Sequence, residues 1–329
     1  MTKFIIQRMA FIPVVLLLAN FIGFAYAHFT PALHAARTPF LRAEPAAPLL
    51  PAYSEYLNSI IKLDFSDEIA LPGTARVNQP VTLGETLGNA TLASLGLLLF
   101  SLLLSIPLGL VLAFWATHND PPGISRWLTI SSTIGLAMPS FYIGSLFIIA
   151  LVAYVIWRGP GTEMPVPLDG FGWDEHLALP VLALMTKPTF QVAQLTAGVL
   201  AGELGKQYIT AARSFGNTWR SIRLRHVMKN VLTPVILTIA GMQRFLIGEL
   251  VLVEWLFRWP GLGRLLAWTL VPAQLTSSQG SPLFLNSALM ATLLTIIAGL
   301  FLLIDFSAAV LVRIMDPRLH EREEQIFKR

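Results

Sequence analysis

The sequence contains no cysteine, and this absence excludes several kinds of protein. A chain without cysteine has no disulfide framework, no thiolate nucleophile and no thiolate ligand for a metal. Its six histidines are scattered along the chain without the short spacings that a zinc site requires. The composition therefore gives no indication of a metal site or of a thiol enzyme.

Signatures of nucleotide binding and hydrolysis are also missing. The sequence has no G-x-x-x-x-G-K-[ST], so the chain does not bind ATP through a P-loop. It has neither H-E-x-x-H nor a nucleophile elbow. We therefore predict that the protein is not an enzyme and that this chain holds no cofactor.

Charged residues are scarce, and long apolar runs take their place. Only 13 % of the 329 residues are charged and 54 % are hydrophobic, whereas soluble domains carry about 25 % charge. Several runs approach the roughly 20 apolar residues that a membrane-spanning helix needs. Because these runs are continuous rather than alternating, they indicate an all-α membrane protein and not a β-barrel.

Six transmembrane helices are predicted, and they define the domain organisation. The predicted spans are residues 9–29, 87–117, 126–157, 177–202, 231–255 and 283–312. Residues 1–85 hold the first span and a proline-rich external segment with a helix near 53–63, residues 86–312 form the transmembrane domain, and 313–329 form a tail. Because Ala25-Tyr26-Ala27 resembles a signal-peptidase site, a cleaved signal peptide is the alternative for the first span.

Breaks and connections are predicted within this frame. Proline should kink the second span near Pro107 and interrupt the third at Pro139. Residues 118–125 are expected to form a short turn, and residues 257–281 a loop.

The distribution of basic residues predicts the orientation. With six spans both termini lie on one side, and that side holds about twice as many lysines and arginines as the other. Positive loops mark the cytoplasm, so we place both termini there. The net charge of +4 follows from this asymmetry and does not indicate binding to nucleic acid.

The inside loop between the fourth and fifth spans, residues 203–230, is basic and has structure of its own. Helix formers fill residues 203–214, and Gly216 then breaks the run, as a glycine past a helix end does. A second amphipathic helix should follow from Thr218, with Pro234 at the beginning of the fifth span. The small pair Ala211-Ala212 offers a low-profile face to another protein; the alternative is a basic loop without a partner. Its cations are Lys206, Arg213, Arg220, Arg223, Arg225 and Lys229.

The Ala-Ala-x-x-x-Gly of this loop resembles the EAA loop of binding-protein-dependent ABC importer permeases. In that family the loop forms a coupling helix that docks in a groove of the cytoplasmic ATPase subunit. The acidic residue that often opens the motif is Thr210 here. The resemblance implies that the residues coupling this chain to an ATPase are Tyr208, Ala211, Ala212, Arg213, Phe215 and Gly216.

A longer match follows the fifth span. Residues 253–266 read VEWLFRWPGLGRLL and resemble the E-x-x-F-x-W-P-G-x-G-x-L segment of the dipeptide/oligopeptide branch of these permeases. Physically, Trp-Pro-Gly at a span end predicts a tight turn with an interfacial aromatic anchor, and a generic interfacial turn is the alternative. The matching residues are Glu254, Phe257, Trp259, Pro260, Gly261 and Gly263.

Polar residues inside the fourth span suggest a pathway. Lys187, Gln191 and Gln194 share one helical face, and charges within a bilayer usually face a wet cavity or a bundle interior. We hypothesise that this face lines the translocation pathway, with Arg244 of the fifth span facing it. The alternative is that Lys187 extends outward to the membrane surface while the glutamines hold helices together.

Taken over nearly the whole chain, the resemblance implies a type I ABC importer permease in the cytoplasmic (inner) membrane of a bacterium or archaeon. It would translocate peptides or similar small solutes, although an external solute-binding protein usually sets the cargo. The implied partners are that binding protein, a second homologous permease and two ATPase subunits. The alternative is a stand-alone secondary transporter or channel, which would show acidic residues at mid-membrane or an inverted repeat.

Overall fold

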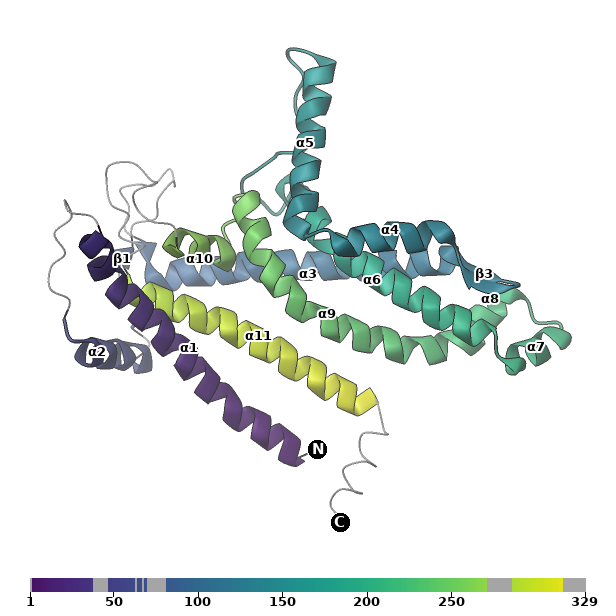
Figure 1. The fold of residues 1–329 in the computed structure, drawn as a ribbon, viewed down its shortest axis with the longest axis horizontal. Helices are drawn as coiled ribbons and strands as arrows, with labels where there is room; N and C mark the ends of the chain where they lie inside the picture. The colour runs from purple at the N-terminus through teal and green to yellow at the C-terminus, as the bar shows by residue number, and fades with distance from the viewer. Residues whose placement is uncertain are drawn as a thin grey trace. The chain divides into compact units, whose positions relative to one another are not determined.

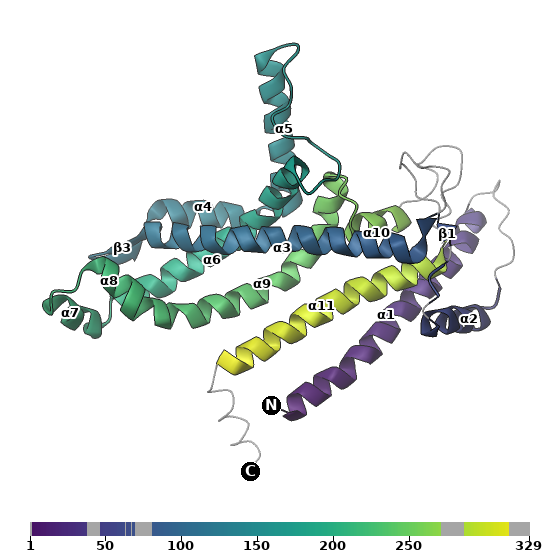
Figure 2. The same cartoon turned by 180° about the vertical axis from the view of Figure 1, so that it is seen from behind.

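The computed structural model describes residues 2–37, 47–62, 64–66, 68–69, 81–270 and 286–315. The chain forms two compact units, one of Met1–Leu95 with Arg258–Leu303 and the other of Gly96–Phe257 with Ile304–Arg329. The described part is almost entirely helical (Figures 1 and 2). The family motifs predicted around 208–234 and 253–266 both lie within it, whereas the tail from residue 316 lies outside the described residues.

Helices run from one end of the described chain to the other. They are α1 (Thr2–Arg37), α2 (Leu49–Ile61), α3 (Leu83–Ala116), α4 (Arg126–Ala137), α5 (Ser140–Arg158), α6 (Ala178–Leu204), α7 (Gln207–Ser214), α8 (Trp219–Ser221), α9 (Met228–Leu256), α10 (Leu262–Leu270) and α11 (Ser287–Met315). A 3-10 turn, Glu175–Leu177, precedes α6, and a π turn, Ile222–Val227, joins α8 to α9.

Two small antiparallel hairpins modify the all-α prediction. β1 (Glu68–Ile69) pairs with β2 (Val81–Thr82), and β3 (Thr117–Asn119) pairs with β4 (Pro122–Ile124). The predicted turn at 118–125 is therefore a hairpin. Likewise, part of the predicted loop 257–281 is helix α10. The apolar side of this helix, which includes Leu262 and Leu265, is buried.

Among the described residues, four helical segments are long and apolar enough to cross a membrane. They are Arg8–Thr30, Leu83–Ala116, Ser140–Arg158 and Ser287–Leu311. They fall on the predicted first, second, third and sixth spans. Helices α6 and α9, with 27 and 29 residues, fall on the predicted fourth and fifth, and each is long enough at a rise of about 1.5 Å per residue.

Proline has two different effects in these helices. Pro139 separates α4 from α5, because the residue before a proline is driven out of the helical region, and Met138 accordingly has ψ 130°. This confirms the predicted interruption, and α5 turns away from α4 (Figure 1). In contrast, α3 continues through Pro107 and α9 through Pro234. Pro234 therefore does not mark the start of the helix, since α9 starts six residues earlier at Met228.

The first unit is held together by an apolar core and a polar cluster. The core joins α3, α10 and α11 and consists of Leu83, Leu87, Ala90, Leu262, Leu265, Leu289 and Leu293. The polar cluster is centred on Asn20 of α1. Its buried side-chain amide donates to the Tyr56 hydroxyl at 2.9 Å and to Thr295 Oγ1 at 2.9 Å. These bonds fasten α2, the predicted external helix, to the long apolar helices.

The second unit is built around α6, which packs against α4, α5 and α9. One cluster of buried apolar side chains, called here the α6–α9 cluster, joins α6, α7, the π turn and α9. Its members are Val192, Leu200, Leu204, Ile209, Ile222, Val227, Val231, Val235 and Met242. Because Ile209 belongs to α7, this cluster fixes the short helix of the basic loop against the ends of the two long helices.

Candidate functional site

Helix α7 forms the exposed end of the second unit. The predicted helical run 203–214 is broken, because α6 ends at Leu204 and Lys206 is extended with ψ 150°. The following eight residues, Gln207–Ser214, make a separate helix that lies beyond the ends of α6 and α9 (Figure 1). A short helix displayed in this way presents one long side to its surroundings.

The two sides of α7 differ in character. Ile209 is buried and Ala212 packs against the α6–α9 cluster, so these residues face inward. Ala211 is exposed, and Phe215 has an exposed fraction of 85 %. Of the small pair singled out in the sequence, only Ala211 thus lies fully on the open side. Tyr208 and Arg213 are also exposed.

The turn after α7 has the geometry that the sequence predicts. Gly216 has φ +82°, a left-handed conformation that glycine adopts without steric cost. Its backbone N–H donates to Arg213 O at 2.9 Å, and the Asn217 side-chain amide donates to Ala212 O at 3.0 Å. Thr218 then caps α8 by accepting from Ser221 N at 3.3 Å. The turn therefore satisfies the last carbonyls of α7 before the chain enters α8.

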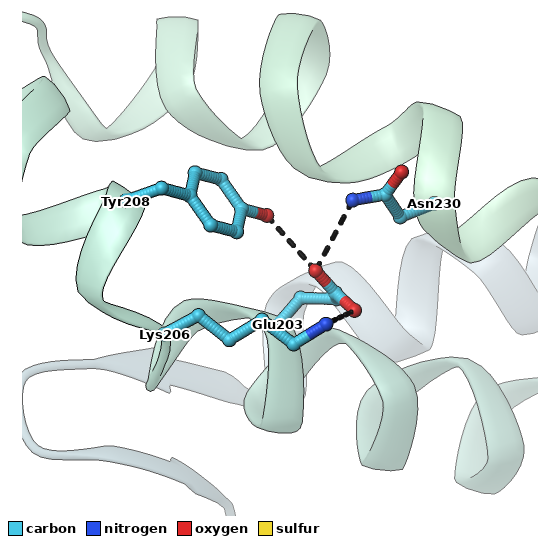
Figure 3. Close-up of polar contacts among 4 residues, drawn as sticks. All are labelled: Glu203, Lys206, Tyr208 and Asn230. Atoms are coloured by element: carbon cyan, nitrogen blue, oxygen red, sulfur yellow. Dashed lines mark hydrogen bonds and ion pairs between the residues drawn. The ribbon is translucent and has the colours of Figure 1, made fainter.

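A single carboxylate, that of Glu203, connects α7 to both long helices (Figure 3). It forms an ion pair with Lys206, accepts from the Tyr208 hydroxyl at 2.9 Å and accepts from Asn230 Nδ2 at 3.2 Å. These groups come from α6, the linker, α7 and α9. No sequence pattern indicates this role of Glu203, because the contact to Asn230 joins residues 27 positions apart.

The electrostatics of Glu203 follow from these donors. Burial by itself would raise the pKa of the carboxyl, but the hydrogen bonds from Lys206, Tyr208 and Asn230 hold the pKa below its ordinary value. Burial, together with the hydrogen bond to this carboxylate, raises the pKa of Tyr208. Glu203 is therefore ionised and Tyr208 neutral at physiological pH, as the pattern of hydrogen bonds requires.

Besides Lys206, two more of the loop's cations are engaged inside the unit. Arg223 of the π turn donates to Asn119 Oδ1 at 2.8 Å, to Phe114 O at 2.7 Å and to Thr117 O. It thereby satisfies carbonyls at the end of α3, and burial lowers its pKa. Arg213 lies over the Trp219 ring at 4.6 Å. Arg220 and Arg225 are exposed, so positive charge remains at the surface near α7.

On the predicted pathway face of α6, Lys187 takes part in a partly buried ion pair. Lys187 of α6 pairs with Glu249 of α9, and Ser140 at the start of α5 donates to the same carboxylate. The lysine ammonium thus points to a neighbouring helix rather than outward. Glu249 was missed in the sequence because it lies 62 positions from Lys187. The sequence does place Lys187 and Glu249, which have opposite charges, in consecutive predicted spans, and this is the signal from which a pair could have been proposed.

A pocket of about 200 Å³ opens beside this pair. Gln191 contributes to its wall, while Gln194 is exposed and is absent from the lining residues. Arg244 lies in α9, but its side chain is outside the described ones. The pocket is lined by Leu136, Lys187, Pro188, Gln191, Met242, Phe245, Leu246 and Glu249.

The segment 253–266 is a buried turn. Trp259 has no exposed surface, and its indole Nε1 donates to Ala93 O at 3.0 Å. Gly261 N donates to Trp259 O at 2.8 Å, which confirms a tight turn. An interfacial anchor was the wrong prediction for this tryptophan, because a ring enclosed by protein cannot reach lipid headgroups.

The other residues of this match are also internal. Glu254 and Phe257 are buried, and Phe257 O accepts from Gly170 N at 3.2 Å. Pro260 is half-buried, whereas Gly261 and Gly263 are buried. These residues therefore act mainly through packing within the protein, and only Pro260 among them keeps appreciable exposed surface.

Known proteins resemble the chain over most of its length. The family described as "Binding-protein-dependent transport system inner membrane component" matches residues 105–321, which is more than half of the chain and includes α7 and the segment 253–266. The oligopeptide transport system permease protein AppB of Bacillus subtilis is 28 % identical over 271 residues, covering 81 % of this chain and 79 % of the relative. The dipeptide transport system permease protein DppB of Haemophilus influenzae is 26 % identical over 291 residues, covering 80 % and 79 %.

The fold is also similar to that of a solved structure. The MetNI methionine ABC transporter, in an inward facing conformation, contains a chain that superimposes with a TM-score of 0.52 and 16 % sequence identity. The match covers 71 % of this chain and 98 % of that one. At this level of identity the likeness shows the fold, which is that of an ABC importer permease.

Proposed function

This chain belongs to the family of binding-protein-dependent transport system inner membrane components, and we propose that it carries peptides or similar small solutes. Membership makes it a multi-pass transport component rather than the ATPase, and it implies an ATPase and a binding protein as partners. Peptides are proposed as cargo because the similar permeases are named for oligopeptides and dipeptides.

The open side of α7 is the proposed contact with the ATPase. Tyr208, Ala211, Arg213 and Phe215 are exposed there, while Ile209 holds the other side of the helix to the α6–α9 cluster. A partner that moves α7 would therefore also move α6 and α9. Rocking of these helices as a unit would convert closure of the ATPase pair into opening and closing of the pathway.

The remaining parts of the proposed importer follow from charge and topology. Six spans would place both termini and α7 in the cytoplasm, in agreement with the positive charge of the loop. The arrangement proposed for the assembly is type I, with a second homologous permease completing the pathway and two ATPases below. One face of α6 would border that pathway, together with Arg244 of α9. The residues of that face are Lys187, Gln191 and Gln194.

The match of residues 105–321 to the family, with α7 exposed inside it, carries this proposal. Co-purification tests it against the alternative of a stand-alone secondary transporter or channel. The full chain, expressed with its genomic neighbours and extracted in detergent, should bring down an ATP-hydrolysing subunit. A chain that transports after reconstitution alone would contradict the proposal.

A substitution at Gly216 tests the role of α7 itself. Gly216→Val places a branched side chain at φ +82° and costs about 1–2 kcal/mol of backbone strain, which corresponds to about tenfold in an equilibrium that depends on the turn. We expect uptake by reconstituted complexes to fall about tenfold or more while ATP hydrolysis continues.

Gly161→Val is the matched control. Gly161 has φ +86°, and in both glycines an added Cβ meets nothing within 4 Å, so the local strain is comparable. It lies in the loop before α6, at the predicted outer side, and its replacement should leave uptake per ATP unchanged. Equal losses in the two variants would show that Gly216 has no specific part in coupling.

A further inference from the structure

We propose that Lys187 and Glu249, with Ser140 and Gln191, form a binding site for solutes that carry both an ammonium and a carboxylate group. This inference rests on the proposed transport function and adds a chemical class of ligand to it. The site lies in the second unit, where α5, α6 and α9 meet, and opens into the pocket of about 200 Å³.

Apolar packing already joins the two helices that carry the ion pair. Taking two charges out of water costs free energy that their attraction often does not exceed, and well-packed apolar residues can replace such a pair without loss of stability. Here α6 and α9 already share the α6–α9 cluster. An ion pair that lies beside a pocket is therefore available for a role other than packing.

The two charged groups remain accessible from the pocket. The side chain of Lys187 is 25 % exposed and that of Glu249 is 20 % exposed. Ser140 is buried and donates to Oε2 of Glu249. Oε1, which pairs with Lys187, can exchange the lysine for a ligand ammonium without loss of the Ser140 bond. A ligand can therefore reach the charges without prior unfolding of the helices.

The charge balance selects the ligand. Without a ligand the lysine and glutamate neutralise one another, so these two groups together carry no net charge. A zwitterion can separate the pair and form two new ones, its carboxylate with Lys187 and its ammonium with Glu249. A solute with only one of these groups would leave one protein charge without a partner in a medium of low dielectric constant, which is costly.

The remaining walls suit a short peptide. Gln191 supplies an amide that can bond to a peptide group, and Met242, Phe245 and Leu246 supply apolar contacts. The volume lies below the roughly 300–1,000 Å³ of sites for drug-sized ligands. It fits a dipeptide or a single amino acid better than a longer chain.

Ligand-induced thermal stabilisation of the full-length chain, purified with its co-purifying subunits and without binding protein, tests the site. The probes are dialanine, alanine, N-acetyl-dialanine and dialanine amide. We expect the zwitterions to bind about tenfold more tightly than either capped peptide, because each charged hydrogen bond contributes about 1.5–3 kcal/mol. A better response to alanine than to dialanine would assign the site to amino acids.

Two single substitutions should shift this preference in opposite directions. Lys187→Gln leaves the carboxylate and should favour dialanine amide, whereas Glu249→Gln leaves the ammonium and should favour N-acetyl-dialanine. The double exchange K187E/E249K retains both charges and should again prefer the zwitterions, which controls for variants that fold poorly. The apolar pair K187M/E249M should fold and lose the preference.

The outcomes separate this inference from the proposed function. Equal binding of all four probes to the unaltered chain, or the same probe preference in both single variants, would overturn the site. If the complex nevertheless imports peptides with its ATPase, the transport assignment stands without it. Failure of ATPase co-purification would instead overturn the proposed function, and the binding measurement does not depend on that subunit.

Discussion

The loop around α7 and the segment 253–266 are both turns that the sequence links to one family, yet they are built in opposite ways. In the first, Phe215 and Ala211 are exposed, and the helix is held by polar contacts to Glu203. In the second, Phe257 and Trp259 are enclosed completely. The shorter motif thus lies at an open surface, and the longer one lies inside the protein.

This difference determines how many side chains each motif constrains. A buried turn constrains every side chain that packs in it, because interiors are filled as densely as crystals of small organic molecules. An open surface constrains only the few side chains that reach a partner, together with the backbone that presents them. Substitutions in the two regions should therefore affect stability and coupling to different extents.

The largest expected effect on stability is in the buried turn. Trp259→Ala removes a fully enclosed ring and its hydrogen bond to Ala93 O, and should lower the free energy of unfolding by about 3–5 kcal/mol. Trp157→Ala is the matched control, because that ring is 81 % exposed, and it should change stability by less than about 0.5 kcal/mol. Thermal unfolding monitored by size-exclusion chromatography measures both. Similar losses would show that burial does not distinguish the two rings.

A smaller effect is expected from the carboxylate that holds α7. Glu203→Gln keeps the shape of the side chain but removes the negative charge that pairs with Lys206 and accepts the hydrogen bond from Tyr208. At this site near the surface we expect a loss of about 0.5–1 kcal/mol and less solute imported per ATP hydrolysed. The exposed Glu163, replaced by Gln, serves as the control and should leave both quantities unchanged.

The same carboxylate predicts a dependence on pH. Since folding lowers the pKa of Glu203, its contribution to stability is complete above the unfolded value of about 4.3 and is lost as the pH falls through the lower folded value. The stability difference between the unaltered chain and Glu203→Gln should therefore be constant from pH 8 to pH 6 and should shrink in acid. A difference that already changes near neutral pH would contradict this assignment.

The smallest effect on stability is expected at Phe215. Its ring is 85 % exposed, so Phe215→Ser should alter the free energy of unfolding by less than about 0.5 kcal/mol. Aromatic residues at the centre of an interface often contribute about 2 kcal/mol or more, so retention of the ATPase in pull-down titrations should fall more than tenfold. Phe171→Ser, in the loop before α6, should retain it fully. Undiminished retention in Phe215→Ser would exclude this ring from the contact.

The helical frame was predictable because it depends on local properties. Runs of apolar residues placed α1, α3, α5 and α11 close to their observed positions, and Pro139 marked a real break. Pro234 lies inside α9 rather than at a helix end, since a proline is tolerated inside a long helix when neighbouring helices support it. Helix α10 was missed because a short amphipathic segment after a Trp-Pro-Gly turn is easily taken for a loop.

The contacts at the candidate sites could not be predicted, because they join distant parts of the chain. Nothing near Glu203 in the sequence indicates Asn230, and opposite charges in consecutive predicted spans do not by themselves show that Lys187 meets Glu249. The same holds for Arg223, whose acceptors Phe114, Thr117 and Asn119 precede it by more than a hundred positions. Such pairs depend on how helices pack, which spacing along one helix does not specify.

Composition and pattern alone determined that this chain crosses a membrane, because some twenty consecutive apolar residues are stable only where no water is present. They also determined its family, through the Ala-Ala-x-x-x-Gly of the loop around α7 and the longer match at residues 253–266. Only the folded structure decided that Trp259 is enclosed, that Lys187 is neutralised by Glu249, and that α7 presents Phe215 while it hides Ile209. Burial and charge pairing depend on which segments meet in space, and that is settled by the packing of the helices.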